Sequence, residues 1–372
     1  MRSDTATITD ALEDAILNVI EGVGNINIIV AGKTGVGKST LINCVFRGEL
    51  AKTGSGKPVT QQIEEITKEG HPLTIIDSKG LELKDFQKIS ADLEFFIKKR
   101  SISGDENKHI HAAWLCIQES SNRVEDAEIE LCNMLKKLSI PVIVVITQSM
   151  FGKENDFITK VKKDLNAATA FVQVRALAGE FEDDDGELYK FKEKNINALI
   201  TETAGLIPEA KKRAFANALN SRHQSSMKIK IEQAGKEVLA ASTLAAVAAA
   251  SPIPFSDAIL LVPIQVGMLA KVGVTFGMDV STSALTTLVM SAVGSGAVTV
   301  VGRVLVTGLL KMIPGVGTVV GGAIAATTAA ALTKALGAAY IAVLTDFCEK
   351  NPGKDLDIAL IGAELKRKMS FS

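Results

Sequence analysis

Residues 27–46, NIIVAGKTGVGKSTLINCVF, decide how the first half of this 372-residue chain folds. An apolar run passes into a glycine-rich turn, and a segment with apolar residues at helical spacing follows. The turn matches GxxxxGK[ST] at every position, and its glycines let successive backbone N–H groups point inward at an anion. A strand, this turn and a helix in succession therefore predict a phosphate-binding loop (P-loop) of a nucleotide-hydrolysing protein, not a chance glycine-rich turn.

The residues of this loop are expected to hold a nucleoside triphosphate together. Lys38 is predicted to reach the β and γ phosphates, which also makes it a candidate catalytic residue, and the Ser39 hydroxyl is predicted to bind Mg²⁺. The first turn of the following helix adds the positive end of its dipole. The predicted nucleotide-binding residues here are Gly32, Lys33, Thr34, Gly35, Val36, Gly37, Lys38, Ser39 and Thr40.

Two stretches downstream complete the predicted phosphate and metal site. Asp77 lies at the end of the strand-like run LTIID, and Gly80 follows it in a DxxG pattern. A carboxylate at this place can hold Mg²⁺ through water, and the Gly80 N–H can face the γ-phosphate during catalysis. Between these motifs, in TGSGKPVTQQI, Thr60 is the predicted mobile threonine that completes the Mg²⁺ shell and acts in catalysis. Thr53 and Ser55 are alternatives for this role.

Short β-rich runs alternate with helical patterns over the first 200 residues or so. The runs INIIV, IEEITKE, PLTIIDS, IHAAWLCI, PVIVVIT and FVQVRA read as buried strands. Segments between them, such as 84–100 and 125–138, have helical spacing. We therefore expect an α/β P-loop domain with a mostly parallel sheet, followed by an all-α hydrophobic helical domain.

Charge is distributed unevenly along the chain. The net charge of −1 gives no electrostatic reason to expect nucleic acid as a partner. The four cysteines show no metal-binding spacing, which favours reduced thiols in the cytoplasm. Only six charged residues occur from Val238 to Thr345. The predicted domains are an N-terminal amphipathic helix (1–24), the P-loop domain (25–205), a polar helical connector (206–236), and a hydrophobic helical domain with a polar C-terminal helix (237–372).

The order and spacing of these motifs resemble the Era-like branch of the TRAFAC GTPases over residues 25–205. KPVTQQI, AAWLCIQESSNRVEDAEIELCNMLKKLSIPVIVVITQ, and PIPFSDAILLVPIQVGMLAKVGVTFG at 252–277 are similar to the subset with a C-terminal hydrophobic domain of unknown function. Immunity-related and dynamin-like GTPases are a looser analogy. The resemblance implies binding of GTP or GDP with Mg²⁺ and slow GTP hydrolysis.

The base-reading motif departs from the pattern of these GTPases. They carry NKxD or TKxD after the fifth strand, and the aspartate accepts hydrogen bonds from guanine. The matching stretch here is Thr147-Gln148-Ser149-Met150, and a methionine cannot accept those bonds. Guanine is implied by the resemblance, and an ATP-using P-loop enzyme stays an alternative. The residues expected to contact the base are Thr147, Gln148, Ala176 and Leu177.

A second departure concerns the hydrolysis step. Leu81 stands where many of these GTPases have a glutamine that positions the attacking water. By comparison with unassisted GTPases we expect an intrinsic turnover of about 10⁻³ per second or below. Acceleration would need a partner, a second copy of this chain across the nucleotide, or Arg123 in the SSNRVED loop as a catalytic residue. The alternative for Arg123 is a surface ion pair with the neighbouring acidic residues.

The hydrophobic third of the chain offers three readings. The segments 238–256, 280–302 and 312–333 are uncharged over lengths close to the roughly 20 residues that cross a bilayer. Gly317 and Gly321 form a GxxxG that permits close helix contact. Prolines such as Pro263 interrupt the tract, which argues against constitutive insertion. We expect residues 237–345 to form a helical domain that attaches conditionally to a membrane or self-associates as a dimer or oligomer. Integral insertion and a purely soluble bundle are the alternatives.

The predicted function is a GTP-binding switch in the cytoplasm, peripheral or integral at a membrane, in which nucleotide state controls the helical domain. The alternative from another class is a structural or pore-forming membrane effector gated by the P-loop domain.

Overall fold

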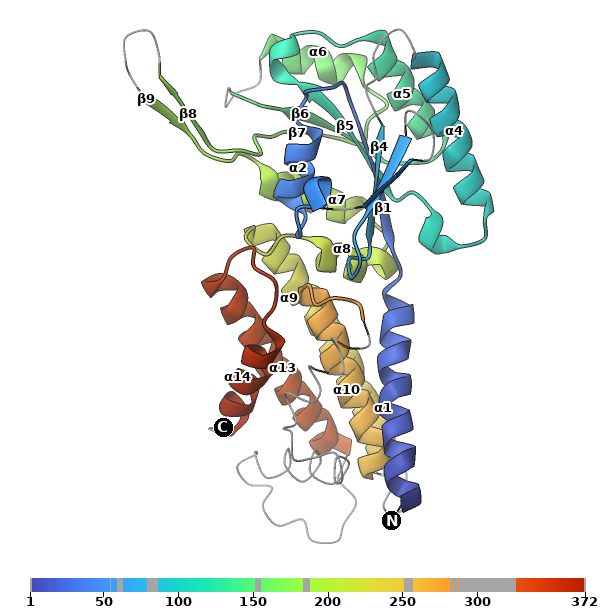
Figure 1. Ribbon diagram of the computed structural model, residues 1–372, viewed down its shortest axis with the longest axis vertical. Helices are drawn as coiled ribbons and strands as arrows, with labels where there is room; N and C mark the ends of the chain where they lie inside the picture. Colours follow the sequence, from blue (N-terminus) through green and yellow to red (C-terminus); the bar gives the residue numbers. More distant parts are fainter. Residues whose placement is uncertain are drawn as a thin grey trace. The chain divides into compact units, whose positions relative to one another are not determined.

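The computed structural model describes residues 2–53, 55–58, 63–78, 86–150, 155–182, 188–250, 257–281, 283, 287 and 326–370 (Figure 1). The chain divides into two compact units. Residues 25–226 form the first, which we call the nucleotide unit. Residues 1–24 and 227–372 form the second, which we call the helical unit. The predicted connector 206–236 is thus divided, because 206–226 belong to the nucleotide unit and 227–236 to the helical unit.

The nucleotide unit is built on a seven-stranded sheet in the order β2-β3-β4-β1-β5-β6-β7. Strands β1, β4, β5, β6 and β7 run parallel, and β2 and β3 add an antiparallel edge. The central strands are mostly buried and mostly apolar, as expected for a parallel sheet covered on both faces. The strands are β1 (Ile26–Ala31), β2 (Ser55–Pro58), β3 (Ile63–Thr67), β4 (Leu73–Ser78), β5 (Ala112–Gln118), β6 (Val142–Thr147) and β7 (Ala170–Gln173).

Helices cover both faces of this sheet (Figure 1). On one face, α4 (Phe86–Ile102), α5 (Asp126–Lys137) and α6 (Asp156–Asp164) contribute to a single apolar core with the inward side chains of the strands. On the other face lie α2 (Lys38–Val45), α7 (Ile196–Leu206) and α8 (Lys212–Ala218). There the Trp114 ring stacks on Phe46 at 5.5 Å, and its indole N–H donates to Thr203 in α7 at 3.1 Å. The predicted α/β fold with a mostly parallel sheet is confirmed.

Smaller elements complete the nucleotide unit. They are α3 (Leu50–Thr53), the 3₁₀ turns η1 (Glu106–Lys108), η2 (Glu119–Ser121) and η3 (Glu209–Lys211), and a two-stranded hairpin of β8 (Gly179–Glu182) and β9 (Leu188–Phe191).

The helical unit contains no strand among its described residues. Its helices are α1 (Arg2–Val23), α9 (Gln224–Ala249, whose first three residues belong to the nucleotide unit), α10 (Asp257–Phe276), α13 (Ala326–Lys350) and α14 (Ile358–Ser370). Within the unit α1 packs along α10, α10 packs on α13, and α13 packs on α14. Pro263 lies inside α10 and does not end it, contrary to the interruption expected from the sequence. Gly317 and Gly321, with most of 280–325, lie outside the described residues.

Gly337 of α13 marks a close approach of helices inside the helical unit. A Cβ atom at this position would lie 2.4 Å from Cγ2 and 2.6 Å from Cγ1 of Val238 in α9, and 3.1 Å from Sδ of Met268 in α10. Such distances are far shorter than van der Waals contact, and a β-branched valine cannot turn away at low cost. Glycine is therefore required here by packing, although it weakens the helix itself.

Gly337→Ala is accordingly expected to lower the free energy of unfolding by about 1–3 kcal/mol, because overpacking outweighs the roughly 1 kcal/mol gained in helix propensity. Val238→Ala removes both clashing methyl groups. The double variant should then be more stable than the sum of the two single changes predicts. Urea unfolding of the wild type, both single variants and the double variant measures this coupling, and strictly additive effects would rule out the direct contact.

Candidate nucleotide-binding site

The loop between β1 and α2 has the backbone of an anion cradle. Gly32, Gly35 and Gly37 adopt φ values of 148°, 80° and 95°, and Gly37 stands at the start of α2. Gly32 is also confined by space, since a Cβ there would lie 2.4 Å from the carbonyl oxygen of Cys116 in β5. The glycines of the motif are thus needed both for the turn and for its close approach to the sheet.

The Lys38 side chain folds back over this loop. Its Nζ donates to the carbonyl oxygens of Gly32 at 2.8 Å and Lys33 at 3.1 Å. The ammonium group is therefore held at the mouth of the glycine turn, where phosphate oxygens would offer charged acceptors in exchange for neutral ones. Ser39 and Thr40 follow in the first turn of α2, with the Ser39 side chain exposed.

Glu125 connects the loop to the start of α5. It forms an ion pair with Lys33 and a second one with Arg123 at 2.9 Å, and it closes a capping box with Glu128. The hydrogen bond from Lys33 lowers the pKa of Glu125, so this carboxylate is ionised at neutral pH. Arg123 thus forms a surface ion pair, as the alternative prediction for this residue stated, and 68% of its side chain is exposed. Its catalytic role stays a prediction.

The segment after β6 lies against the same loop. The Thr147 hydroxyl donates to the carbonyl of Val36 at 2.7 Å, and the Gln148 amide donates to the carbonyl of Gly35 at 3.2 Å. The side-chain amide of Gln118 donates to Oε1 of Gln148 at 2.9 Å. The Gln148 backbone is in the left-handed region (φ 53°). These contacts join the predicted base-reading segment to the predicted phosphate loop, as one nucleotide spanning both would require.

A pocket of about 270 Å³ opens beside these contacts. Its lining is mostly apolar side chains and backbone, which suits the faces of a purine ring. The four residues predicted to contact a base all line it, together with Thr40 of α2 and Met150. These lining residues are Thr40, Thr147, Gln148, Met150, Ala176 and Leu177.

One residue that supports this region was not predicted from the sequence. Glu119 follows β5 directly and is buried, at 7% exposed. Its Oε2 accepts from the Met150 backbone N–H at 2.7 Å, and its Oε1 accepts from the Asn155 amide at 3.3 Å. The only available signal was an acidic residue at the end of a buried strand. One oxygen thus holds the base-reading segment and the other holds the N-cap residue of α6, so both carboxylate oxygens already accept hydrogen bonds from the protein.

Two of the predicted metal ligands lie in the described residues, Ser39 in the first turn of α2 and Asp77 near the carboxyl end of β4, and their role as ligands stays a prediction. Asp77 is the penultimate residue of β4 and pairs in register with Val30, the penultimate residue of β1, the strand that leads into the loop. Ser39 and Asp77 offer hard oxygen donors, the type that Mg²⁺ prefers, and the glycine cradle fits a phosphate group. Thr60, Gly80 and Leu81 lie outside the described residues. Of the alternatives to Thr60, Thr53 ends α3 and Ser55 pairs with Thr67 in the β2–β3 ladder.

Comparison with known proteins agrees with this geometry. Residues 27–148 match the family model of the 50S ribosome-binding GTPases, and residues 213–365 match a domain of unknown function (DUF697). The probable GTP-binding protein EngB of Maridesulfovibrio salexigens is 30% identical over 149 residues, which cover 40% of this chain and 72% of that protein.

Two further relatives match over smaller shares of their own length. GTPase Era of Buchnera aphidicola is 34% identical over 123 residues, covering 32% of this chain and 39% of that protein. Translocase of chloroplast 90 of Arabidopsis thaliana is 36% identical over 84 residues, covering 20% of this chain and 11% of that protein. With the loop, the base-reading segment and the parallel sheet in place, the chain belongs to the TRAFAC P-loop GTPases, the family of GTP-binding proteins to which EngB and Era also belong.

Proposed function

We propose that this protein is a GTP-dependent switch that hydrolyses GTP slowly and controls the attachment of its helical unit to a membrane. The observation that carries the proposal is a continuous set of hydrogen bonds inside the nucleotide unit. These bonds join the end of α2, the helix that begins at the phosphate loop, to the segment that leads into α9.

Residues 45–47 and 217–220 form this connection. The Arg47 backbone N–H donates to the carbonyl of Ala218 at 2.8 Å, and its guanidinium donates to the carbonyl and side-chain oxygens of Asn217, both at 2.9 Å. The Asn220 N–H donates to the carbonyl of Val45 at 2.9 Å. Arg47 and Asn217 are buried, so these bonds are shielded from water. A shift of α2 on binding a γ-phosphate would therefore be passed to the start of α9.

The nucleotide chemistry falls to residues of the loop and its neighbours. The loop N–H groups and Lys38 would hold the phosphates, while Ser39 and Asp77 would hold Mg²⁺, which neutralises charge on the phosphate oxygens when bound. Thr60 and Gly80 are proposed to respond to the γ-phosphate. Without a glutamine at position 81, the chain itself offers no side chain there to orient water, and hydrolysis would be slow until another group assists.

The second part of α9 supports a membrane as the target. Leu239, Leu244 and Val247 are 64%, 57% and 67% exposed, and no charged residue lies between Leu239 and Ala250. Large exposed apolar side chains gathered on an uncharged helical segment are typical of an interaction site, and an interfacial helix would bury them among lipid headgroups and acyl chains.

A spanning helix is less well supported by the described residues. There α13 is the one helix long and apolar enough to cross a bilayer, and 44% of its apolar window is buried within the protein. Core helices of soluble proteins have the same character. We therefore propose peripheral attachment.

Liposome flotation tests the switch. Purified protein should stay in solution without detergent, and a non-hydrolysable GTP analogue should increase flotation several-fold over GDP. Replacing Leu239, Leu244 and Val247 together by Gln should remove this increase, because the apolar face is lost. Leu360→Gln is the matched control, since Leu360 of α14 is 56% exposed in the same unit.

The outcomes separate the alternatives. Equal flotation with GDP and with the GTP analogue would refute the coupling between nucleotide state and membrane attachment. A need for detergent in every nucleotide state would indicate integral insertion. Release of a trapped dye that continues after GTP is hydrolysed would indicate a pore-forming effector instead of a switch.

A further inference from the structure

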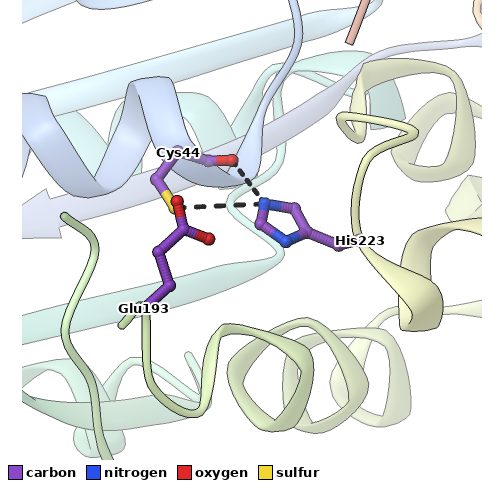
Figure 2. A group of neighbouring side chains, drawn as sticks. All are labelled: Cys44, Glu193 and His223. Atoms are coloured by element: carbon purple, nitrogen blue, oxygen red, sulfur yellow. Dashed lines mark hydrogen bonds between the residues drawn. The ribbon is translucent and has the colours of Figure 1, made fainter. Parts of the chain in front are cut away.

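Three side chains far apart in the sequence meet near the C-terminal end of α2. Cys44 lies in the last turn of α2, Glu193 lies just before α7, and His223 lies between α8 and α9. Figure 2 shows the thiol, the carboxylate and the imidazole turned toward one another. Among the described residues they form the one group of three potential metal ligands whose donor atoms all lie within 4.8 Å of one another. We propose that Cys44, Glu193 and His223 bind a zinc-class divalent cation.

The distances fit a shared ion. Nε2 of His223 lies 3.9 Å from Sγ of Cys44. Zinc bonds of about 2.3 Å to sulfur and about 2.0 Å to nitrogen, at a tetrahedral angle, place the two donors about 3.5 Å apart. The thiol and the imidazole therefore need to approach by only a few tenths of an ångström. The thiol proton passes to water when the thiolate binds the ion.

The kind of donor selects the kind of metal. One sulfur, one imidazole nitrogen and one carboxylate oxygen form a ligand set typical of Zn²⁺, with a fourth position left for water or another group. Mg²⁺ and Ca²⁺ prefer oxygen ligands alone, so this site is chemically distinct from the Mg²⁺ site of the phosphate loop. Cys44 and His223 are 4% and 6% exposed, whereas Glu193 is partly exposed and gives an ion access from solvent.

Without an ion, other hydrogen bonds hold the cluster closed. His223 Nε2 lies 2.7 Å from the Cys44 carbonyl oxygen, so in this state Nε2–H donates to that oxygen. Coordination through Nε2 requires the other tautomer, with the proton on Nδ1. The Arg222 guanidinium lies 3.1 Å from Cys44 Sγ and 2.9 Å from a Glu193 oxygen. A positive group thus occupies the space between thiol and carboxylate.

Arg222 is therefore the competitor of the metal. Its side chain is 37% exposed and can turn into solvent, which leaves the two acidic ligands to a divalent ion. Substitutions at a ligand and at Arg222 should therefore change the affinity for zinc in opposite directions. Removing a ligand should weaken zinc binding, whereas removing Arg222 should strengthen it. The site does not depend on whether the helical unit binds a membrane.

Zinc titration of the full chain under reducing conditions, against a chromophoric chelator, is the test. We expect one zinc per chain and, with cobalt(II), a thiolate charge-transfer absorption. Cys44→Ser and His223→Ala should each weaken binding at least tenfold and abolish that absorption. Arg222→Ala should tighten zinc binding several-fold. Cys132→Ser, which changes another buried cysteine with neither His223 nor Glu193 beside it, should bind zinc as the wild type does.

If Cys44→Ser or His223→Ala folds poorly, the Arg222→Ala variant still tests the site. Arg222 is partly exposed, so its replacement does not disturb the core. Absence of the cobalt–thiolate absorption in the wild type would overturn the site. Zinc affinity unchanged by Cys44→Ser, or unchanged or weakened by Arg222→Ala, would overturn it equally.

Discussion

Lys38→Ala is expected to lower affinity for GTP at least about 100-fold, or roughly 2.7 kcal/mol, while the fold survives. The Lys38 ammonium makes its hydrogen bonds to the carbonyl oxygens of Gly32 and Lys33 at the mouth of the loop, and a bound triphosphate would replace these neutral acceptors by charged ones. The variant loses that charge-assisted contact. The two carbonyl groups left behind lie beside the exposed residues Thr34 and Gly35, where water can replace the lysine.

Titration with a fluorescently labelled GTP analogue measures this loss, and circular dichroism confirms the fold. Lys98→Ala is the control, because Lys98 pairs only with Glu94 on the surface of α4 in the described contacts. It should bind the analogue as the wild type does. Affinity close to that of the wild type in Lys38→Ala would refute the assignment of the phosphate loop.

The fold of the nucleotide unit was predictable because its signals are local. The loop motif is contiguous, and its glycines are required by backbone angles and by the space beside Cys116. The central strands are covered on both faces, so they appear in the sequence as largely apolar runs. The base-reading segment was predicted for the same reason, since it begins at the last residue of one of these strands, and its contact with a base stays a prediction.

The remaining features depend on contacts between distant positions, which composition and spacing do not encode. Cys44 and His223 are 179 residues apart in the sequence and have no metal-binding spacing, yet they lie in hydrogen-bonding range. Glu119 supports Met150 from another strand end. Pro263 was expected to interrupt a helix, but α10 continues through it. Proline in a helix removes one hydrogen bond, and packing of α10 against α1 and α13 offsets that loss.

Base selectivity is the second property on which a large effect is expected. Met150 lines the pocket beside Gln148 and is 49% exposed, while its backbone N–H is fixed by Glu119. The side chain therefore sits on a supported backbone where relatives with NKxD or TKxD have their aspartate. Since methionine does not replace the hydrogen bonds that a carboxylate would accept from guanine, we expect selectivity in the wild type to rest on shape and on backbone groups near Ala176 and Leu177. We expect GTP to compete at least about tenfold better than ATP, or about 1.4 kcal/mol.

Met150→Asp should widen this preference for GTP by about another tenfold or more. A carboxylate at this position can accept from both N–H groups on the guanine edge, whereas adenine lacks the matching donors, and a site built to hydrogen-bond one ligand discriminates against a ligand without those groups. Met150→Asn is the matched control, because its amide offers one acceptor without charge and adds a donor that faces the guanine donors, so its gain should be smaller.

Displacement of a labelled GTP analogue by GTP and by ATP measures the ratio for all three proteins. Equal competition in the wild type would show that this chain has lost guanine selectivity with its aspartate. A ratio unchanged by Met150→Asp would show that the base does not occupy the pocket between Gln148 and Leu177.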